Sequence, residues 1–209
     1  MRIALIHALR HSPPPVEAAF AELWPEAVLM NLLDDSLAAD LARDGALTPA
    51  MTERFLHLAR YAAGTGARGI LFTCSAFGPC IAACKAALPE IPVLTPNEAM
   101  LEEAAGFRRV GLLASFAPTL RSMPPEFPPG VEVVPCLAEG ALAALDAGHV
   151  ATHDRLAAEA SRRLTDCDAV ALAQFSLARA APGVREATGR PVLTTPHSAV
   201  RKLRRLLGA

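Results

Sequence analysis

The sequence predicts an α/β protein with two similar lobes, each a parallel sheet flanked by helices. Two observations predict this fold class. First, short strands that are apolar throughout alternate with helical segments, and this alternation calls for a parallel sheet covered on both faces. The first such strand, Arg2–His7 (RIALIH), is continuously apolar, which is typical of a central parallel strand. Second, the series of strands and helices occurs twice along the chain.

The expected elements of the first half follow one another closely. A helix begins after Ser12, another at Thr48, a third runs from Pro79 to about Leu88, and Asn97 caps a fourth. The strands between and before them are expected at 2–7, 27–33, 70–73 and 91–94.

The second half repeats the alternation of strands and helices. Strands are expected at 109–114, 131–134, 169–173 and 192–194, and helices at 139–146, 152–164 and 198–207. In the helix 152–164, Leu156, Ala160 and Leu164 share one face, which we expect to point inward.

The repeat is visible at the level of residues, and it is an internal duplication at the scale of a domain. It divides the chain into a first lobe of residues 1–95 plus 197–209 and a second lobe of residues 96–196. Two such lobes would each present the carboxyl ends of their strands to a ligand cleft between them. Three pairs of segments can be aligned in sequence: Arg2–Ala8 with Arg109–Ser115, Gly69–Ala76 with Ala169–Ser176, and Ile91–Glu98 with Arg190–Ser198.

Composition excludes several classes of function. The 209 residues are 52% hydrophobic and 20% charged, with a formal net charge of −1, so we expect a packed core and no nucleic-acid binding. No apolar run approaches the roughly 20 residues of a membrane span, and the start of the chain lacks the features of a secretion signal. Five cysteines in such a protein are expected to be reduced thiols in the cytoplasm.

Metal binding is not expected either. Cys80 and Cys84 lie four residues apart on one expected helix, but no histidine or third cysteine completes a ligand set beside them. Buried helix cysteines explain this pair better, because a free cysteine behaves as a small hydrophobic residue.

Cys74 is the residue on which the functional prediction depends. The apolar run Ile70–Thr73 ends there, and Gly78-Pro79 opens the next helix, so the thiol should lie at the carboxyl edge of the sheet. At the start of a helix the thiolate is favoured, so we expect a lowered pKa and a role as proton acceptor or nucleophile. The alternative is a buried small residue, which is what we expect of the other four cysteines.

These features resemble the aspartate/glutamate/hydantoin racemase superfamily over essentially the whole chain. The segment Thr73-Cys74-Ser75-Ala76 matches the family's first-lobe cysteine pattern, and Ser115–Thr119 resembles its loop that holds the substrate carboxylate. The resemblance implies two pseudo-symmetric α/β lobes, a small-molecule site between them and proton transfer at the carbon α to a carboxylate or carbonyl. It also implies that no cofactor is used and that a homodimer is an option.

The second lobe departs from the family pattern. Where the racemases carry their other cysteine, this chain has Gln174, and Cys167 belongs to the far end of that strand. A glutamine can donate a hydrogen bond to a carboxylate or enolate oxygen but cannot act as a base, so a two-thiol racemase is not expected. The alternative is a vestigial position. Relatives with one thiol are decarboxylases of substituted malonates, but their cysteine lies in the second lobe.

Further candidates follow the expected strand ends. His197 is a candidate second acid or base in place of the missing thiol, with helix capping as the alternative. The expected substrate-binding residues are hydroxyl, small or apolar neighbours of these positions, with capping or core packing as their alternatives. They are His7, Ser75, Ala76, Ser115, Thr119, Phe175 and Ser176. His57 and His153 are expected on helix surfaces.

The leading hypothesis is therefore a cofactor-independent enzyme that acts at the carbon α to a carboxylate or carbonyl of a small molecule. Cys74 would be its single acid or base, and isomerase and decarboxylase chemistry both stay open. The alternative is a non-catalytic protein that binds a small carboxylate or another small anion. Hydrolysis by a thiol nucleophile is a third option, but it needs a base beside Cys74, and no histidine lies near it in sequence.

Overall fold

The computed structural model describes residues 1–209, which form two compact units. Unit 1 comprises Met1–Ala99 together with Ala199–Ala209, and unit 2 comprises Met100–Ser198. Each unit contains one sheet of four parallel strands, and the strand orders are β2-β1-β3-β4 and β6-β5-β7-β8. The identical order confirms that the sequence repeat is a repeat of fold.

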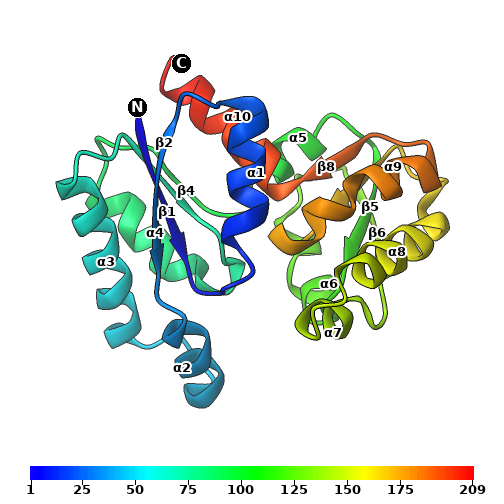
Figure 1. Ribbon diagram of the computed structural model, residues 1–209, viewed down its shortest axis with the longest axis horizontal. Helices are drawn as coiled ribbons and strands as arrows, with labels where there is room; N and C mark the ends of the chain where they lie inside the picture. Colours follow the sequence, from blue (N-terminus) through cyan, green and yellow to red (C-terminus); the bar gives the residue numbers. More distant parts are fainter. The chain divides into compact units, whose positions relative to one another are not determined.

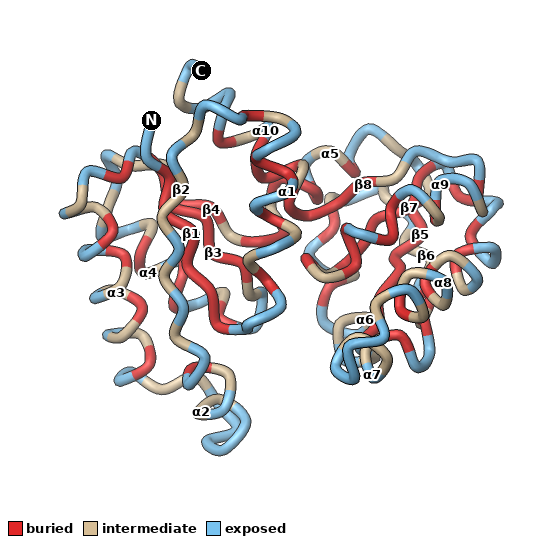
Figure 2. Tube along the Cα trace, in the orientation of Figure 1, coloured by how far each residue is buried: buried red, intermediate tan, exposed pale blue.

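The strands of unit 1 are short and its two central strands are buried (Figure 2). They are β1 (Arg2–His7), β2 (Val28–Leu33), β3 (Gly69–Phe72) and β4 (Val93–Leu94). The helices are α1 (Pro13–Leu23), α2 (Ser36–Asp44), α3 (Pro49–Gly64), α4 (Gly78–Ala87) and the C-terminal part of α10 (Thr195–Leu206). A 3-10 turn, η1 (Ser75–Phe77), precedes α4.

Helices cover both faces of this sheet (Figure 1). On the face of α3 and α4, the ring of Phe55 stacks on Phe72 with centroids 5.4 Å apart and lies 4.9 Å from Phe77. On the other face, the side chain of Leu203 from α10 comes so close to Gly69 that an added Cβ would lie 3.2 Å from its Cδ2 atom. The sheet is therefore enclosed, and only the strand ends and edges remain accessible.

Unit 2 repeats this arrangement with different helices. Its strands are β5 (Arg109–Ala114), β6 (Glu132–Leu137), β7 (Ala169–Leu172) and β8 (Val192–Thr194). The α-helices are α5 (Glu98–Ala104), α6 (Thr119–Ser122), α7 (Ala141–Asp146), α8 (Val150–Ser161) and α9 (Ala181–Thr188), and α10 begins here. The 3-10 turns are η2 (Pro124–Glu126), η3 (Arg162–Leu164) and η4 (Phe175–Ala180). One core cluster draws on α8 and α9, and another draws on α5 and the segment around Met123 and Phe127.

The strand expected at 131–134 is longer in the structure, because β6 continues through Pro135 to Leu137. β6 is an edge strand, and the backbone N–H groups of Glu132 and Ala138 point to β5. The odd-numbered Pro135 therefore turns its missing N–H away from the ladder, which is where an edge strand tolerates proline.

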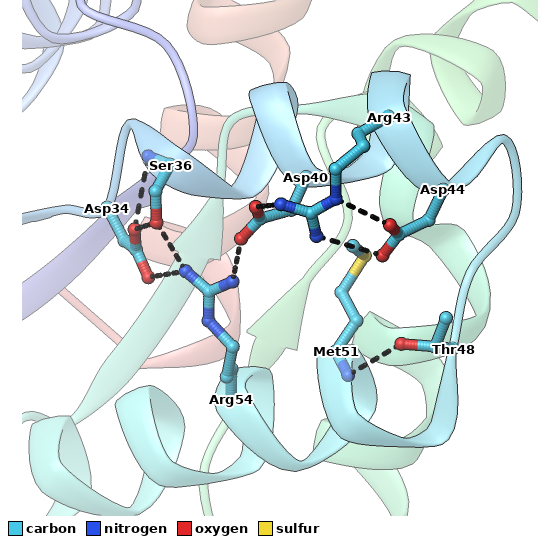
Figure 3. A network of polar contacts seen from close by, with 8 residues as sticks. All are labelled: Asp34, Ser36, Asp40, Arg43, Asp44, Thr48, Met51 and Arg54. Atoms are coloured by element: carbon cyan, nitrogen blue, oxygen red, sulfur yellow. Dashed lines mark hydrogen bonds and ion pairs between the residues drawn. The ribbon is translucent and has the colours of Figure 1, made fainter.

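Helix α2 follows the end of β2 and is held by Arg54 from α3 (Figure 3). The guanidinium donates to Asp34 Oδ2 at 2.6 Å and to Asp40 Oδ2 at 2.5 Å. Although burial opposes it, hydrogen bonds from Ser36 and Arg54 lower the pKa of Asp34. Only Leu37 of α2 is buried, so these polar contacts are a large part of what fixes this short helix. No helix of the chain is both long and apolar enough to cross a membrane.

Candidate active site

Each sheet has a topological switch point, the position where open α/β sheets bind ligands. In unit 1 the chain passes from β1 to β2 on one side and then to β3 on the other, so the switch point lies between the carboxyl ends of β1 and β3. In unit 2 it lies between the ends of β5 and β7. Cys74 follows β3, Ser115 follows β5, and Gln174 follows β7. The candidate residues therefore lie at the two switch points.

Cys74 is the one partly exposed cysteine of the chain, because the other four are buried. It has an extended backbone, with φ −127° and ψ 117°, and it precedes the 3-10 turn η1 that leads into α4. Its side chain packs at the margin of the core cluster beneath α3 and α4. Ser75 and Ala76, beside it, are exposed, so the thiol lies at the boundary between core and solvent.

The expected lowering of the Cys74 pKa is wrong for this structure. Burial raises the pKa of the thiol, although a hydrogen bond with the backbone of Ala76 acts in the opposite direction. The physical reason is that a thiolate half-enclosed by apolar side chains loses more hydration than one backbone contact restores. The raised pKa favours the protonated thiol, the form that can donate a proton.

His7 lies at the same switch point, but its ring is enclosed by the chain. It is only 1% exposed. Its Nδ1 lies 2.8 Å from Thr73 Oγ1, and its Nε2 lies 2.9 Å from Asn31 Oδ1. The Asn31 amide donates in turn to the Glu17 carboxylate at 2.7 Å. Because a carboxylate only accepts, the Asn31 oxygen must face His7, and the histidine proton sits on Nε2.

This chain of contacts determines the direction of the hydrogen bond between Thr73 and His7. With neutral His7, the Thr73 hydroxyl donates to Nδ1. Burial lowers the pKa of His7, against a hydrogen bond with Asn31 and the charge of Glu17 that both raise it. Direct binding of substrate by His7, which the sequence suggested, would require the ring to give up one of these two partners. Its place in the structure is that of a residue that fixes the end of β3 next to Cys74.

At the switch point of unit 2, the side chain of Gln174 forms hydrogen bonds with Ser115 and Thr119. Its Oε1 accepts a hydrogen bond from the backbone N–H of Ser115 at 3.1 Å, and its Nε2 donates to Thr119 Oγ1 at 3.3 Å. The three residues that the sequence predicted separately are therefore brought together. One N–H of the Gln174 amide remains for a further acceptor, since a primary amide has two.

Two buried hydroxyls lie at the ends of β5 and β8, the two strands that flank β7. Ser115 Oγ and Thr195 Oγ1 are both buried and have no hydrogen-bond partner. A buried polar group without a partner costs about 1–3 kcal/mol, so such groups are usually satisfied by water or by a ligand. Hydroxyls and amide N–H groups are donors that suit a carboxylate.

His197 and the remaining candidates lie around this edge. His197, in the first turn of α10, is half-buried, and its Nδ1 lies 2.7 Å from Thr194 Oγ1. Ser176 is half-buried, and Phe175 is buried, as expected of an aromatic residue that packs in the core.

One polar cluster around a buried histidine was missed in the sequence. His153, expected on a helix surface, is fully buried, whereas His57 is exposed as expected. His153 Nδ1 lies 2.8 Å from Asp154 Oδ1, and Arg179 donates to the same carboxylate at 2.9 Å. The spacing of His153, Ala157 and Ser161 on one face of α8 was the available signal, because these three are its buried residues.

Comparison with known proteins supports the fold. No family model and no curated protein matches the chain. Among solved structures, allantoin racemase from Klebsiella pneumoniae is similar with a TM-score of 0.76 and 19% identity, covering 100% of this chain and 88% of that one. An aspartate racemase homologue from Pyrococcus horikoshii has a TM-score of 0.71 and 16% identity, covering 100% and 99%.

A third similar structure is arylmalonate decarboxylase, with a TM-score of 0.70 and 21% identity, covering 100% of this chain and 93% of that one. At these identities the likeness shows the fold. The fold that the sequence resemblance implied is confirmed: the chain has the same fold as these two racemase structures and arylmalonate decarboxylase.

Proposed function

We propose that this protein is a cofactor-independent enzyme that transfers a proton at the carbon α to a carboxylate or carbonyl of a small molecule. Cys74 is its single thiol acid or base. The observation that carries the proposal is the position of Cys74, a partly exposed thiol at a switch point, while every other cysteine is buried. Racemases and a decarboxylase among the structures with this fold support the same class of chemistry.

Because its pKa is raised, Cys74 is proposed to donate a proton before it accepts one. A protonated thiol gives its proton to the α-carbon of an enolate: the S–H bond breaks, the C–H bond forms, and the negative charge passes to sulfur. The enolate arises by loss of carbon dioxide or by loss of a proton to another base. Solvent then returns a proton to the thiolate. A decarboxylase needs only this one donation, whereas an isomerase needs a second group.

The donors at the switch point of unit 2 are proposed to bind a small carboxylate. The free N–H of Gln174 and the unpaired hydroxyl of Ser115 are the candidates. Both are hydrogen-bond donors that suit a negatively charged oxygen. Thr119 orients the Gln174 amide through its hydroxyl.

The alternative is a protein that binds a small carboxylate without turning it over. The observation in its favour is Gln174, because an amide moves no proton at the position where the racemases have a second thiol. Such a protein would use the anion-binding donors of unit 2, and Cys74 would take part in no reaction.

Deuterium incorporation from heavy water separates the two functions. Candidate substrates are 2-substituted malonates, amino acids and 5-substituted hydantoins, with proton NMR as the readout. Cys74→Ala should lower incorporation about 100-fold or more, as expected for loss of a general acid. Cys167→Ala, which removes a buried thiol at the far end of β7, should leave it unchanged. Binding without incorporation for every compound would establish the carboxylate-binding protein instead.

Alkylation tests the state of the thiol without a substrate. Iodoacetamide should label Cys74 ahead of the four buried cysteines, with a pH midpoint above the free-thiol value of about 8.5. A midpoint below that value would show that the thiolate is favoured at neutral pH, and Cys74 would then be a base rather than a donor.

A further inference from the structure

Four side chains of unit 1 form a hydrogen-bond relay from the protein surface to the end of β3. It starts at Glu17, which is exposed on α1 and accepts from Asn31 Nδ2 of β2 at 2.7 Å. The amide oxygen of Asn31 lies 2.9 Å from Nε2 of the buried His7, at the end of β1. The ring then reaches Thr73, the residue before Cys74, through Nδ1 at 2.8 Å.

The direction of every hydrogen bond in this relay follows from Glu17. A carboxylate only accepts, so the NH₂ group of Asn31 must face it, and the amide oxygen must face His7. The neutral ring then carries its proton on Nε2 and accepts at Nδ1 from the Thr73 hydroxyl. An amide, an imidazole and a hydroxyl can each donate and accept, whereas the ionised carboxylate cannot. Glu17 is therefore the member that fixes the polarity of the other three.

The last hydrogen bond of the relay holds a part of β3 that lies beyond the sheet. The pairing of β1 with β3 ends at Ile6 and Phe72. Thr73 is attached to β1 by its backbone N–H, which donates to the Ile6 carbonyl at 3.1 Å, and by its hydroxyl. The hydroxyl has a second acceptor in the same carbonyl, at 3.4 Å. It has only one proton to donate, so it turns either to His7 or to this carbonyl.

We propose that Glu17 is a positioning residue for the Cys74 site. Through Asn31 and His7 it directs the Thr73 hydroxyl to the imidazole instead of the backbone carbonyl, and so it sets the geometry of the strand end that carries the thiol. An amide moves no proton, so the relay orients groups and does not conduct protons. The inference rests on the proposed function in one respect, namely that Cys74 is the reacting group.

Glu17→Lys reverses the polarity of the relay. A lysine ammonium only donates, so the Asn31 oxygen should turn toward it and the NH₂ group toward His7. The ring proton should then move from Nε2 to Nδ1. Long-range proton–nitrogen NMR spectra of the ¹⁵N-labelled protein distinguish the two ring nitrogens, and the His7→Gln variant assigns their signals. Burial lowers the pKa of His7, so the ring is neutral at pH 8, where the spectra are recorded.

Two further variants separate polarity from charge. Glu26→Lys makes the same change of charge at an exposed position in the turn between α1 and β2, and it should leave the proton of His7 on Nε2. The double variant Glu17→Lys/Asn31→Asp should restore the Nε2–H form. A carboxylate at position 31 accepts from both the lysine and the ring, so the direction of the relay no longer depends on position 17.

The resonances of Cys74 report whether the relay positions the thiol. Its backbone amide signal should shift in Glu17→Lys and return in the double variant, while that of Cys167 in unit 2 should not move. Deuterium incorporation into the substrate should fall about five-fold or more in Glu17→Lys, because a misplaced reacting group slows proton transfer. The double variant should recover it, and Glu26→Lys should not reduce it.

Each outcome supports or overturns the inference. A His7 proton that stays on Nε2 in Glu17→Lys, or that moves equally in Glu26→Lys, would overturn it. A reversed ring with an unmoved Cys74 signal, or full incorporation in Glu17→Lys, would overturn the positioning role. A reversed ring and a shifted Cys74 signal without incorporation by the unmodified protein would support the relay and reject the catalytic proposal.

Discussion

The side chain of Gln174 accepts a hydrogen bond from the backbone N–H of Ser115 at 3.1 Å, and this contact joins the ends of β7 and β5. A backbone N–H only donates, so the contact settles which end of the amide is oxygen. Nε2 must then point toward Thr119, at 3.3 Å. Gln174 therefore has a structural role at the switch point and still presents one N–H to a ligand.

Gln174→Glu separates these two roles. The carboxylate can still accept from Ser115, but it cannot donate to an anion and it adds a negative charge beside the site. We expect the dissociation constant for small carboxylates to rise about ten-fold or more. The melting temperature should change little, because the bond to Ser115 is retained. Titration calorimetry and a thermal melt measure the two quantities.

A control for net charge is Ala151→Glu, an exposed position near the start of α8. It adds the same charge away from the switch point, so it should leave carboxylate affinity unchanged. Equal weakening by the two variants would show a general charge effect and remove Gln174 from the binding site.

The stability of the fold should depend on His7 in mildly acidic solution. Burial lowers the pKa of this histidine in the folded state, so below its ordinary value of about 6.5 the unfolded chain binds a proton that the folded chain resists. Stability is therefore fully present above about pH 6.5 and falls as the pH drops below it. Urea unfolding between pH 7.5 and 5 measures this fall.

His7→Gln should make that dependence shallower and cost about 1–3 kcal/mol at pH 7.5, because buried hydrogen bonds are lost. The exposed His57 is the control, since His57→Gln removes a histidine without touching the Thr73 and Asn31 contacts. An unchanged pH profile for His7→Gln would assign the acid sensitivity to other groups.

The sequence predicted the elements that depend on local pattern. Continuous apolar runs identified the buried strands, and the duplication correctly implied two similar α/β units, whose sheets have the same strand order in the structure. The position of Cys74 after a central strand also followed from pattern alone, because the end of a strand and the start of a helix are visible as residue types.

Features that depend on tertiary contacts could not be predicted in this way. Gln174 and Ser115 lie 59 residues apart, so their hydrogen bond needs the register of β5 and β7. In the helix expected at 152–164, the inward face was that of Leu156, Ala160 and Leu164. Leu164 is buried, in η3, but Leu156 and Ala160 are only half-buried, and His153 and Ala157 form the buried face of α8. An alanine-rich helix gives a weak periodic signal, and the sheet beneath it decides which face turns inward.

The direction of the Cys74 pKa shift also depends on tertiary contacts and could not be predicted from the sequence. Its place before a helix favours the thiolate, and this much was readable from sequence. The apolar side chains that surround the sulfur come from segments distant in the chain, and they decide the sign of the shift.

The packing of β5 against η3 should tolerate no side chain at Gly111. A Cβ there would lie 2.8 Å from Leu164 Cδ1 and 3.0 Å from its Cβ and Cδ2, closer than carbon atoms pack. Gly111→Ala should therefore cost about 1–3 kcal/mol of unfolding free energy by overpacking. Leu164→Ala alone should cost about 2–5 kcal/mol by leaving a cavity.

The double variant is the decisive measurement, because its new methyl group at position 111 partly fills the space that Leu164→Ala opens. Its cost, measured by urea unfolding, should be smaller than the sum of the two single costs by about 1 kcal/mol or more. Gly64→Ala is the control for an added methyl group, since nothing lies within 4 Å of a Cβ there. Strict additivity of the Gly111 and Leu164 changes would mean that strand β5 shifts away from η3 instead of straining against it.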